Sequence, residues 1–583
     1  MKGLGGYHRA CDALNAAAVD RLRQRKHREA KPFAIMLPDL ATARLLCHVG
    51  PAEAALLESR RRPIVLLRRR ADIALPLAPD LAPVYATLGV MLPYTPLHHL
   101  LLRAFGAAAP GRLAVLVMTS GNLSDEPIAF RDDDAHARLA TIADGALAHN
   151  RAIHMRCDDS VMHVVGGSAQ LLRRARGYAP EPIALANAST AQVLAVGGHL
   201  KNTFCLLKGR QAFVSHHIGD LENLETLTSF REGIAHYQRL FDIAPTVIAH
   251  DLHPEYLSTR FAQEIGDRRW GMGDSDGTAL DIAPQLPTPN PQLLIPVQHH
   301  HAHIASVLAE HGLDGPVIGV AADGTGYGTD GAIWGCEIMR ADLRGFERLA
   351  HLAYVPLPGG DQAVRQPWRV AAAYLQGAFG DSWLDLDIPF VREARLHGPS
   401  LGTRWRPLAQ MIERGINSPP TSSLGRLFDA VAALLGLCDE VVYEGQAAIE
   451  LEMLAAPDAR PYPFAIAEGA PALLDVAPAI RAIVGEIERG AALPQIAGRF
   501  HCTVAALLAE ACERARAATG LRVIALSGGV FQNRMLLENM LALLEQRDFT
   551  VYLNRQVPPN DGGLSLGQAA VAAALVESER VTG

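Results

Sequence analysis

The sequence is poor in cysteine, in aromatic residues and in long hydrophobic runs, and these scarcities exclude several classes of protein. Its 8 cysteines are spread over 583 residues without any Cys-x-x-Cys pair, which argues against a disulfide framework and a thiolate zinc finger. No apolar run approaches the roughly 18 residues of a membrane span. Residues 1–26 also lack the apolar core of a signal peptide. We therefore expect a cytoplasmic protein that does not enter a membrane.

The composition is that of a globular protein with more than one domain. Hydrophobic residues make up 49% of the chain and charged residues 20%, and a chain of 583 residues is too long for a single core. Residues 1–187 carry 24 Lys and Arg against 17 Asp and Glu, a net +7, whereas the remainder carries 30 against 44, a net −14. A basic part thus precedes an acidic one, and the basic part suits phosphate-rich ligands.

An RNA-binding module is one alternative explanation of the basic part. Net charge alone does not separate a nucleotide from RNA. Aromatic residues make up only 6% of the chain, however, and no run of them interleaves the arginines, as a stacking platform for nucleic acid requires. We therefore do not expect nucleic acid to be the main ligand.

The first part of the chain has the alternating pattern of an α/β domain. Strand-like runs at 32–37, 64–67 and 113–118 alternate with helix-like segments. The last run leads into Thr119-Ser120-Gly121-Asn122, and ligands of α/β folds collect at the carboxyl ends of strands. A basic cluster, which could equally be a solvated helix face, ends where the strand at 32 begins; it contains Lys26, Arg28 and Lys31.

These motifs resemble the YrdC-like domain, which forms threonylcarbamoyl-adenylate. Its Lys-x-Arg element matches Lys26 and Arg28, and its Ser-x-Asn loop matches Ser120 and Asn122. The resemblance implies that these four residues are catalytic. It also implies nucleotide contacts by Lys2, in the early glycine-rich turn 2–6, and by Lys31, Thr119 and Arg156. The joint pattern of 31–34, 119–122, 150–153, 156–160 and 173–178 looks like the variant found in hydrogenase-maturation carbamoyltransferases.

The remainder of the chain predicts a linker followed by a duplicated fold. Residues 184–191 are small and follow Pro180 and Pro182, so we interpret them as a linker between a first domain at 1–183 and a second at 192–583. Three short strands are expected at 193–196, 204–208 and 212–217, and the proline-rich stretch 273–296 is expected to be a surface insertion.

A similar order of elements then recurs. A strand at 317–322 runs into the glycine-rich turn 323–328, and a strand at 523–526 runs into Ser527-Gly528-Gly529. The recurrence favours an actin-like ATPase fold, in which nucleotide lies between two halves and turns from each half meet its phosphates.

Four histidines begin a predicted helix at residues 299–303. His299 and His303 are four residues apart, so on a helix their Cβ atoms are about 6 Å apart on one face, close enough to share a metal ion. No Glu follows His299, which excludes the His-Glu-x-x-His site of a zinc protease. The pair lacks a third ligand, and a polar helix start with clustered histidines is the alternative.

The second domain resembles the Kae1/TsaD family. In that family a His-x-x-x-His pair and a late Asp bind a metal beside the nucleotide phosphates, which implies His299, His303 and Asp561 as ligands. Two histidines and a carboxylate accept either iron(II) or zinc. The resemblance further implies nucleotide contacts by Lys201, Asp323, Gly324, Arg426, Asp429, Glu444, Gly528, Gly529 and Asn533.

A YrdC-like domain followed by a Kae1-like domain is the order of the hydrogenase-maturation carbamoyltransferases, the HypF family. That resemblance implies carbamoyl phosphate or carbamate as carbamoyl source, ATP with Mg²⁺ as activator, and the C-terminal cysteine of a partner maturation protein as acceptor. The carbamoyl group becomes cyanide on the iron of [NiFe]-hydrogenase. The family also carries an N-terminal acylphosphatase-like domain and a zinc-finger-like region that find no match here. We therefore expect an incomplete first domain, with its first strand in doubt, and poor use of carbamoyl phosphate.

Two other enzymes remain as alternatives. An O-carbamoyltransferase that acts on small molecules resembles this chain but places the Kae1-like domain first. A tRNA threonylcarbamoyl-type enzyme shares both domains but usually carries them on separate chains.

Overall fold

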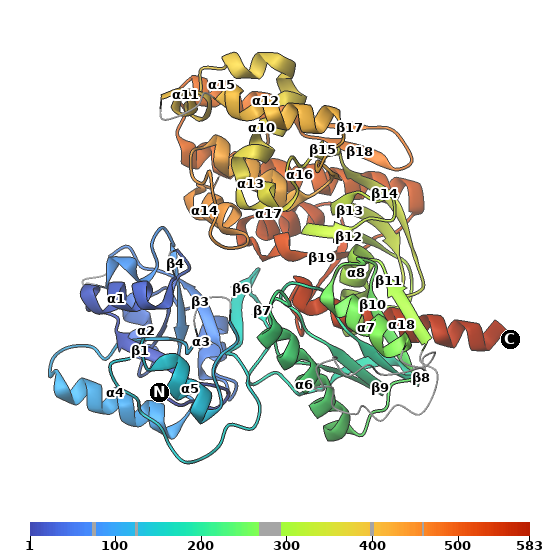
Figure 1. The fold of residues 1–583 in the computed structure, drawn as a ribbon. Coiled ribbons are helices and arrows are strands. Elements are labelled where there is room, and N and C mark those ends of the chain that lie inside the picture. Colours follow the sequence, from blue (N-terminus) through green and yellow to red (C-terminus); the bar gives the residue numbers. More distant parts are fainter. Residues whose placement is uncertain are drawn as a thin grey trace, which may run out of the picture. The chain divides into compact units, whose positions relative to one another are not determined.

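A computed structural model describes residues 1–28, 30–72, 77–122, 126–267, 293–396, 401–457 and 460–582 (Figure 1). The chain forms two compact units. The first contains Met1–Pro296 together with Asn554–Gly583, and the second contains Val297–Leu553. Among the described residues, none of the helices combines the length and the hydropathy needed to cross a bilayer.

The first unit begins with a seven-stranded sheet of order β1-β5-β2-β4-β3-β6-β7. Both of its faces are covered: Val65, Val90 and Val117 belong to a core on one face, and Met36, Met91 and Met118 to a core on the other. The strands are β1 His8–Asp12, β2 Ala34–Met36, β3 Ile64–Arg68, β4 Thr87–Met91, β5 Leu116–Ser120, β6 Val161–Val165 and β7 Ser168–Arg173. The helices are α1 Ala16–Lys26, α2 Leu40–Leu46, α3 Pro51–Glu58, α4 Pro96–Ala108, α5 Asp132–Leu139 and the short η1 Pro79–Leu81.

Helix α1 places Lys26 in its last turn. The helix starts at Asn15, whose side chain accepts a hydrogen bond from the Ala18 N–H, and it ends at His27 in the left-handed region with φ 52°. Val19 and Leu22 turn its apolar face toward the sheet. The first strand that the structure describes, β1, pairs antiparallel with β5, so that His8 lies opposite Ser120.

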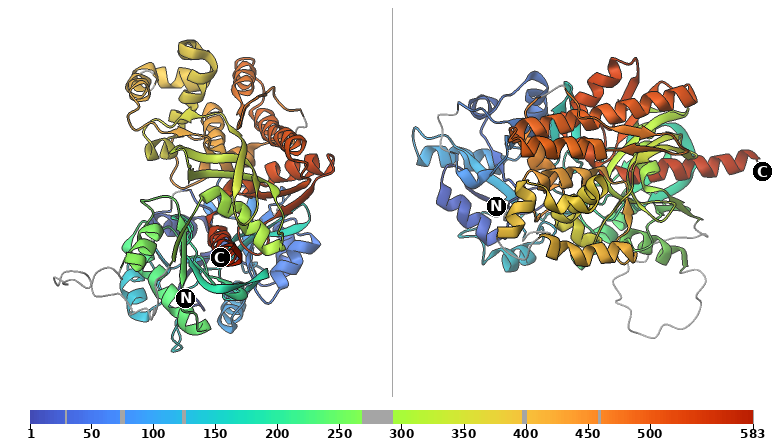
Figure 2. Two further views of the ribbon diagram at one scale, coloured as in Figure 1. Left: turned by 90° about the vertical axis from the view of Figure 1, so that its right-hand side faces the viewer. Right: turned by 90° about the horizontal axis from the view of Figure 1, so that it is seen from above.

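A four-stranded sheet of order β11-β10-β8-β9 completes the first unit. Its strands are β8 Ile183–Ala195, β9 Cys205–Val214, β10 Val247–Asp251 and β11 Leu293–Val297, and its helices are α6 Leu224–Phe241, α7 Leu257–Asp267 and α18 Leu564–Thr582, with η4 Asp561–Gly563 before the last. Helix α18 is the long helix that ends at the C-terminus in Figure 2.

The sequence interpretation of this region needs three corrections. Residues 184–191 are not a linker but part of β8, where residues alternate between buried and exposed against β9. The strands expected at 204–208 and 212–217 are one strand, because Gly209 at φ +59° sits in an irregularity of the ladder rather than in a turn. Most of the expected insertion, 273–292, lies outside the described residues, and 293–296 belong to β11.

The second unit is built on a sheet with the path β17-β18-β14-β13-β12-β19-β20, to which β15 and β16 are attached. The strands are β12 Val317–Tyr327, β13 Ile333–Ala341, β14 Phe346–Leu352, β15 Val355–Pro356, β16 Pro420–Thr421, β17 Ala465–Ala467, β18 Ala472–Asp475, β19 Val523–Ser527 and β20 Thr550–Leu553. The helices are α8 His299–His311, α9 Asp361–Arg365, α10 Pro367–Phe379, α11 Pro389–Leu396, α12 Leu401–Glu413, α13 Leu424–Leu434, α14 Gln446–Leu454, α15 Ala477–Glu488, α16 Leu493–Thr519 and α17 Arg534–Glu545, with η2 Gly380–Asp385 and η3 Gly529–Gln532.

The two sheets after residue 183 share a topology. In the first unit, β8 pairs antiparallel with β9 and parallel with β10. In the second, β12 pairs antiparallel with β13 and parallel with β19. The sequence predicted this duplication. A hairpin followed by a parallel strand brings the carboxyl ends of β12 and β19 to one edge, where the glycine-rich segments lie.

Candidate functional site

Lys26 lies at the centre of a polar cluster in the first domain. Its side chain is 1% exposed, and its Nζ donates to the carbonyl oxygens of Ser120 at 2.7 Å and Asn122 at 3.1 Å. The Nζ also contacts Asn122 Oδ1 and lies 3.3 Å from Ser120 Oγ. Ser120 Oγ in turn donates to Asn122 Oδ1 at 2.7 Å. The structure therefore brings together three of the four residues that the sequence indicated as catalytic.

The loop after β5 takes this shape because β1 and β5 approach each other closely. The Gly121 N–H donates to the Tyr7 carbonyl at 2.6 Å. A Cβ atom at position 121 would lie 2.7 Å from that same oxygen, so only glycine fits. The cluster thus combines a buried ammonium with hydroxyl and amide groups at a strand's carboxyl end, which is a suitable place for phosphate oxygens.

The other first-domain candidates make different contacts. Arg28 donates to the carbonyls of Lys31 at 3.1 Å and Pro32 at 2.7 Å, so its guanidinium supports the turn before β2. Lys2 is buried and donates to Asp132 at 2.9 Å. Arg156 lies over the Phe130 ring at 5.0 Å, and burial lowers the pKa of its guanidinium. Thr119 is buried in β5 beside Ser120.

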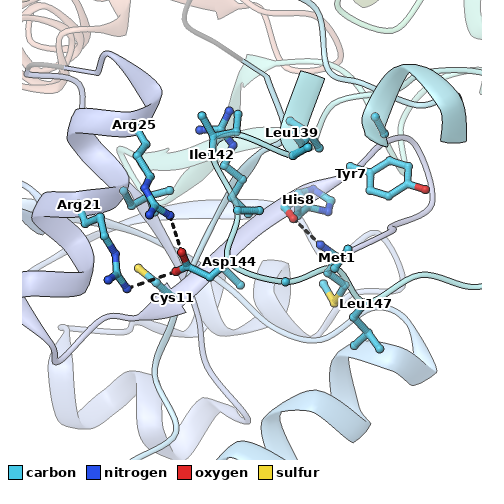
Figure 3. Close-up of a pocket in the computed structure, with 18 of the residues that line it drawn as sticks. Met1, Tyr7, His8, Cys11, Arg21, Arg25, Leu139, Ile142, Asp144 and Leu147 are labelled. Carbon is cyan, nitrogen blue, oxygen red and sulfur yellow. Dashed lines mark hydrogen bonds and ion pairs between the residues drawn. The ribbon is translucent and has the colours of Figure 1, made fainter. Parts of the chain in front are cut away.

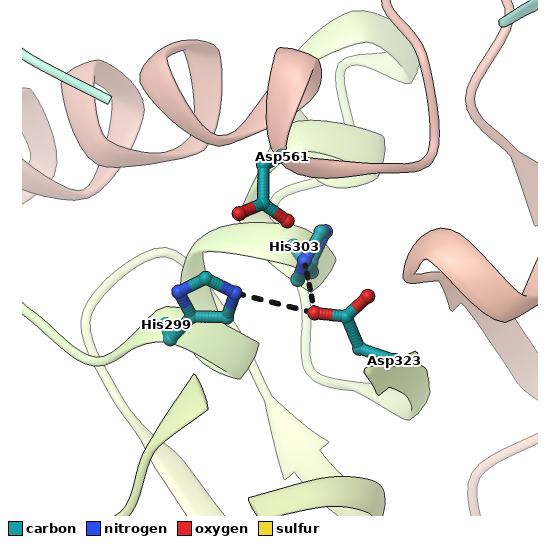
Figure 4. Close-up of side chains that lie close together, drawn as sticks. All are labelled: His299, His303, Asp323 and Asp561. Carbon is teal, nitrogen blue, oxygen red and sulfur yellow. Dashed lines mark hydrogen bonds and ion pairs between the residues drawn. The ribbon is translucent and has the colours of Figure 1, made fainter. Parts of the chain in front are cut away.

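A second cluster forms where α8 meets β12. Gln298 caps the helix by accepting from the His301 N–H at 2.8 Å. His299 Nε2 lies 3.3 Å and His303 Nε2 lies 3.5 Å from the same oxygen, Oδ2 of Asp323 (Figure 4). All three side chains are buried, and their ligand-type atoms lie within 4.8 Å of one another. Two imidazoles and a carboxylate at this separation suit a divalent transition metal.

Asp323 lies in a position that the sequence did not predict. It was expected to contact nucleotide from a turn, but residues 323–327 continue β12, with an irregularity between Ala322 and Gly326. Burial by itself would raise the pKa of the Asp323 carboxyl, yet His299 and His303 hold that pKa well below its usual range. The only sequence signal was an Asp directly after an apolar strand.

Glycines let the strand and the helix approach each other here. A Cβ at position 326 would lie 2.5 Å from His300 Cε1 and 2.7 Å from His299 Cδ2. Gly528 has a φ of +111°, and a Cβ at this position would lie 2.2 Å from the carbonyl oxygen of Ala322, so only glycine fits. The following Gly529 N–H donates to Asp323 Oδ1 at 2.9 Å. The turn after β19 therefore fixes the carboxylate that faces the histidines.

A chain of polar contacts leads from β12 to α13. Ser423 contacts the Gly324 carbonyl through its hydroxyl and accepts from the Arg426 N–H at 3.0 Å. Arg426 Nη2 lies 3.0 Å from Asp429 Oδ2 inside the unit. Burial raises the pKa of the Asp429 carboxyl. The charge of Arg426 lowers this pKa, whereas the charge of Glu444 raises it further.

Glu444 and Asn533 are two further nucleotide contacts that the resemblance predicted in the second unit. Glu444 is exposed. Asn533 caps α17 by accepting from the Leu536 N–H at 2.9 Å, and its amide lies 2.9 Å from His501 Nε2. Both of its polar atoms therefore have structural partners.

Asp561 and Lys201 belong to the first unit. Asp561 opens η4, after Asn560, whose side chain accepts from the Gly562 N–H at 3.0 Å. A Cβ at Gly198 would lie 3.1 Å from Asp561 Oδ2, so glycine keeps space beside this carboxylate. Lys201 takes a left-handed conformation with φ 46°, and its N–H donates to Asp220 at 2.7 Å.

Three family models match the chain. A Sua5/YciO/YrdC model, described as telomere recombination, matches residues 1–175. A model described as HypF Kae1-like domain matches residues 188–310. A third, described as the second subdomain of the carbamoyltransferase Kae1-like domain, matches residues 319–568. They identify a YrdC-like domain followed by a Kae1-like domain, the order of domains that the sequence predicted.

Full-length relatives agree with these models. Carbamoyltransferase HypF2 of Cupriavidus necator is 43% identical over 98% of this chain and 71% of its own length. A crystal structure of full-length HypF in the phosphate- and nucleotide-bound form is 43% identical with a TM-score of 0.88, and covers 99% of this chain and 70% of that one. The structure of T. kodakarensis HypF is 36% identical with a TM-score of 0.86, and covers 99% and 71%. The chain therefore spans about 70% of these relatives, and it belongs to the HypF family of carbamoyltransferases.

Proposed function

We propose that this carbamoyltransferase activates a carbamoyl group as its adenylate in the YrdC-like domain, residues 1–183, and transfers it in the Kae1-like domain. The acceptor is the C-terminal cysteine of a partner maturation protein, and the product serves cyanide synthesis for [NiFe]-hydrogenase in the cytoplasm. The observation that carries the proposal is the pairing of two chemically different clusters in one chain. One is a buried ammonium among loop oxygens at Lys26, and the other is a buried carboxylate between imidazoles at Asp323.

In the first half-reaction, carbamate supplies the nucleophile. Where carbamoyl phosphate is the source, water first cleaves its O–P bond, which releases carbamate and inorganic phosphate. A carbamate oxygen attacks the α-phosphorus of ATP, the bond to the β-phosphate oxygen breaks, and pyrophosphate leaves with Mg²⁺. Lys26, Ser120 and Asn122 orient and neutralise the phosphate oxygens, with Arg28, Lys2, Lys31, Thr119 and Arg156 as further contacts after local rearrangement. Positioning and charge stabilisation suffice, so no covalent nucleophile is needed.

In the second half-reaction, the sulfur of the acceptor cysteine attacks the carbamoyl carbon. The thiol proton is released, the bond from that carbon to the phosphate oxygen breaks, and AMP leaves. Segments around Lys201, Gly324, Gly528 and Arg426 are proposed to hold the nucleotide, together with Asp429, Glu444, Gly529 and Asn533.

We propose that His299, His303 and Asp323 hold iron or zinc, with Asp561 as a fourth ligand. The donor set fits, because two imidazoles and a carboxylate converge within the second unit. When bound, such an ion supplies Lewis-acid polarisation of a substrate oxygen. The chain's own part is to hold Asp323 in place through the Gly529 N–H and to exclude water by burying all three side chains.

Exchange of radioactive pyrophosphate into ATP tests the first half-reaction. The full chain is expected to catalyse exchange only when carbamate is added, and to increase the mass of the acceptor protein by one carbamoyl group. Exchange without carbamate would contradict adenylation of this substrate. Carbamoylation of a small-molecule hydroxyl but not of the cysteine would favour the O-carbamoyltransferase alternative.

A further inference from the structure

A hydrogen bond joins the first domain to the loop that carries Asp561. The Asn560 side chain is 3% exposed, and its Nδ2 donates to the main-chain carbonyl oxygen of Leu172 in β7 at 3.1 Å. The two residues are 388 positions apart in the sequence, and both belong to the first compact unit. The Oδ1 atom of the same amide group accepts from the Gly562 N–H at 3.0 Å. One end of this side chain therefore caps η4, and the other end reaches the YrdC-like domain.

A bulge in β7 makes the Leu172 carbonyl available for this bond. Strand β7 lies at the edge of the seven-stranded sheet and pairs with β6. Two consecutive residues of β6 pair with residues 171 and 173 of β7, so Leu172 is the extra residue between them. The extra residue of a bulge is left out of the ladder. Its carbonyl oxygen can therefore accept from a group outside the sheet.

The segment after the bulge is fixed by contacts on both sides. Arg174 is 3% exposed, and its guanidinium donates to the carbonyl oxygens of Val214 at 2.6 Å and Glu181 at 2.7 Å. The Arg174 carbonyl in turn accepts from the His217 N–H at 2.8 Å. The position of the Leu172 carbonyl is therefore set by the first domain and by the end of β9.

The loop of Asp561 has a second support on its other side. Thr203 Oγ1 donates to the Gly562 carbonyl at 3.0 Å and lies 2.7 Å from Ser565 Oγ. These contacts lie within the Kae1-like domain, whereas the acceptor of the Asn560 amide belongs to the YrdC-like domain. The short helix η4 is thus held by both domains.

We propose that Asn560 is a positioning residue for the transfer site: its bond to Leu172 lets β7 of the adenylating domain set the position of Asp561. The proposal rests on the function proposed above, in which Asp561 is the fourth ligand of the metal. A ligand whose loop is fixed before the ion arrives binds it more tightly, because less ordering is needed on binding. The YrdC-like domain thus contributes to the transfer site in addition to its own chemistry.

Asn560→Ser separates the two bonds of this side chain. Serine caps helices as well as asparagine does, so its hydroxyl can still accept from the Gly562 N–H, but it is too short to reach Leu172. In the metal-free chain, amide hydrogen exchange in a peptide covering 560–568 should become about threefold faster. Affinity for Zn²⁺ should fall roughly tenfold, as for loss of an outer-shell contact. Pyrophosphate exchange should be unchanged, because the Lys26 cluster is intact.

Zinc binding should also change the exchange of β7 itself. Coupling between two sites is reciprocal, so Zn²⁺ should slow amide exchange in a peptide covering 168–176 of the parent chain. In Asn560→Ser, the same peptide should exchange at one rate with and without Zn²⁺. A merely structural role of Asn560 would not produce this zinc-dependent difference.

Two variants serve as matched controls. Asn223→Ser makes the same replacement at the N-terminus of α6, where the side chain accepts from the Thr226 N–H at 2.8 Å. Asp144→Asn removes two exposed ion pairs within the first domain, with Arg21 at 3.3 Å and Arg25 at 2.8 Å (Figure 3). Neither variant should change the affinity for Zn²⁺ or the exchange at 560–568.

Unchanged exchange at 560–568 in metal-free Asn560→Ser would overturn the proposal. Parent zinc affinity in Asn560→Ser, together with a clear loss in Asp561→Asn, would also overturn it. Parent affinity in Asp561→Asn would instead remove Asp561 from the proposed metal site. The exchange rates of the metal-free chain would then still decide whether the bond to Leu172 positions this loop.

Discussion

The two clusters differ in where the partners of their charged group come from. Lys26 is surrounded by oxygens of one short loop, two of them main-chain carbonyls of Ser120 and Asn122. Asp323 is held by two imidazoles from α8 and by an N–H after β19. The first cluster centres on the Lys26 ammonium, which suits an anionic ligand. The second combines the Asp323 carboxylate with two imidazoles, which suits a metal cation. Substitutions in one cluster should therefore impair adenylation without affecting transfer, and substitutions in the other should do the opposite.

The largest effect is expected for His303→Ala. Loss of a direct ligand should weaken metal binding by more than about 100-fold, since loss of an outer-shell partner already costs roughly 10–100-fold. Metal content after purification, measured by mass spectrometry, is the readout. The matched control is His311→Gln, at the other end of the same helix, where the imidazole lies 2.8 Å from the Leu553 carbonyl. Unchanged metal content in His303→Ala would remove this residue from the site.

Lys26→Ala should impair adenylation at the first cluster and leave transfer at the second cluster intact. Loss of a preorganised charge at developing phosphate charge costs roughly 10²–10³-fold in kcat, so pyrophosphate exchange should fall by that factor. Transfer from preformed carbamoyl-adenylate to the acceptor cysteine should continue at the parent rate. Lys208→Ala, at a half-exposed lysine of β9, serves as the control. Loss of both activities in Lys26→Ala would mean that the clusters are not independent.

The contrast between the clusters also explains what the sequence could reveal. Ser120 and Asn122 are two residues apart, so one motif contained most of the first cluster, and helical spacing alone placed His299 beside His303. Asp323 became a candidate ligand only when β12 was seen to continue past Ala322 beside α8. The prediction of a linker at 184–191 was wrong. Its small residues show no apolar periodicity in the sequence, but pairing with β9 holds them in a sheet.

Smaller losses of metal affinity are expected when either of the two proposed carboxylate ligands, Asp323 or Asp561, is replaced by its amide. Asp323→Asn keeps an oxygen atom in place as a weaker, uncharged ligand, so we expect a smaller loss than for His303→Ala, with a metal affinity lower by roughly 10- to 100-fold. Asp561→Asn should have a comparable effect if that residue is a direct ligand. Competition with a chromogenic chelator measures both variants on one scale. An Asp323→Asn variant with parent affinity would return Asp323 to the nucleotide role inferred from the sequence.

The smallest effect concerns stability against acid. Burial lowers the pKa of His501 from 6.5 to about 4, with its Nδ1 2.8 Å from the Ala497 carbonyl and its Nε2 2.9 Å from the Asn533 amide. The folded state thus binds fewer protons than the unfolded state between these values. Stability is complete above pH 6.5 and falls by up to about 3 kcal/mol as the pH drops toward 4.

Hydrogen exchange of α16 against pH measures this loss. His501→Gln should flatten the dependence between pH 6.5 and 4, whereas His48→Gln, at an exposed position, should not. A parent-like slope in His501→Gln would assign the acid sensitivity to other groups.

The most direct test of the division of labour is pyrophosphate exchange by His299→Ala, measured beside Lys26→Ala with added carbamate and ATP. The account predicts that His299→Ala exchanges pyrophosphate at the parent rate but does not carbamoylate the acceptor cysteine, while Lys26→Ala does the reverse when carbamoyl-adenylate is supplied. Loss of exchange in His299→Ala with intact transfer would show that the roles of the two clusters are reversed.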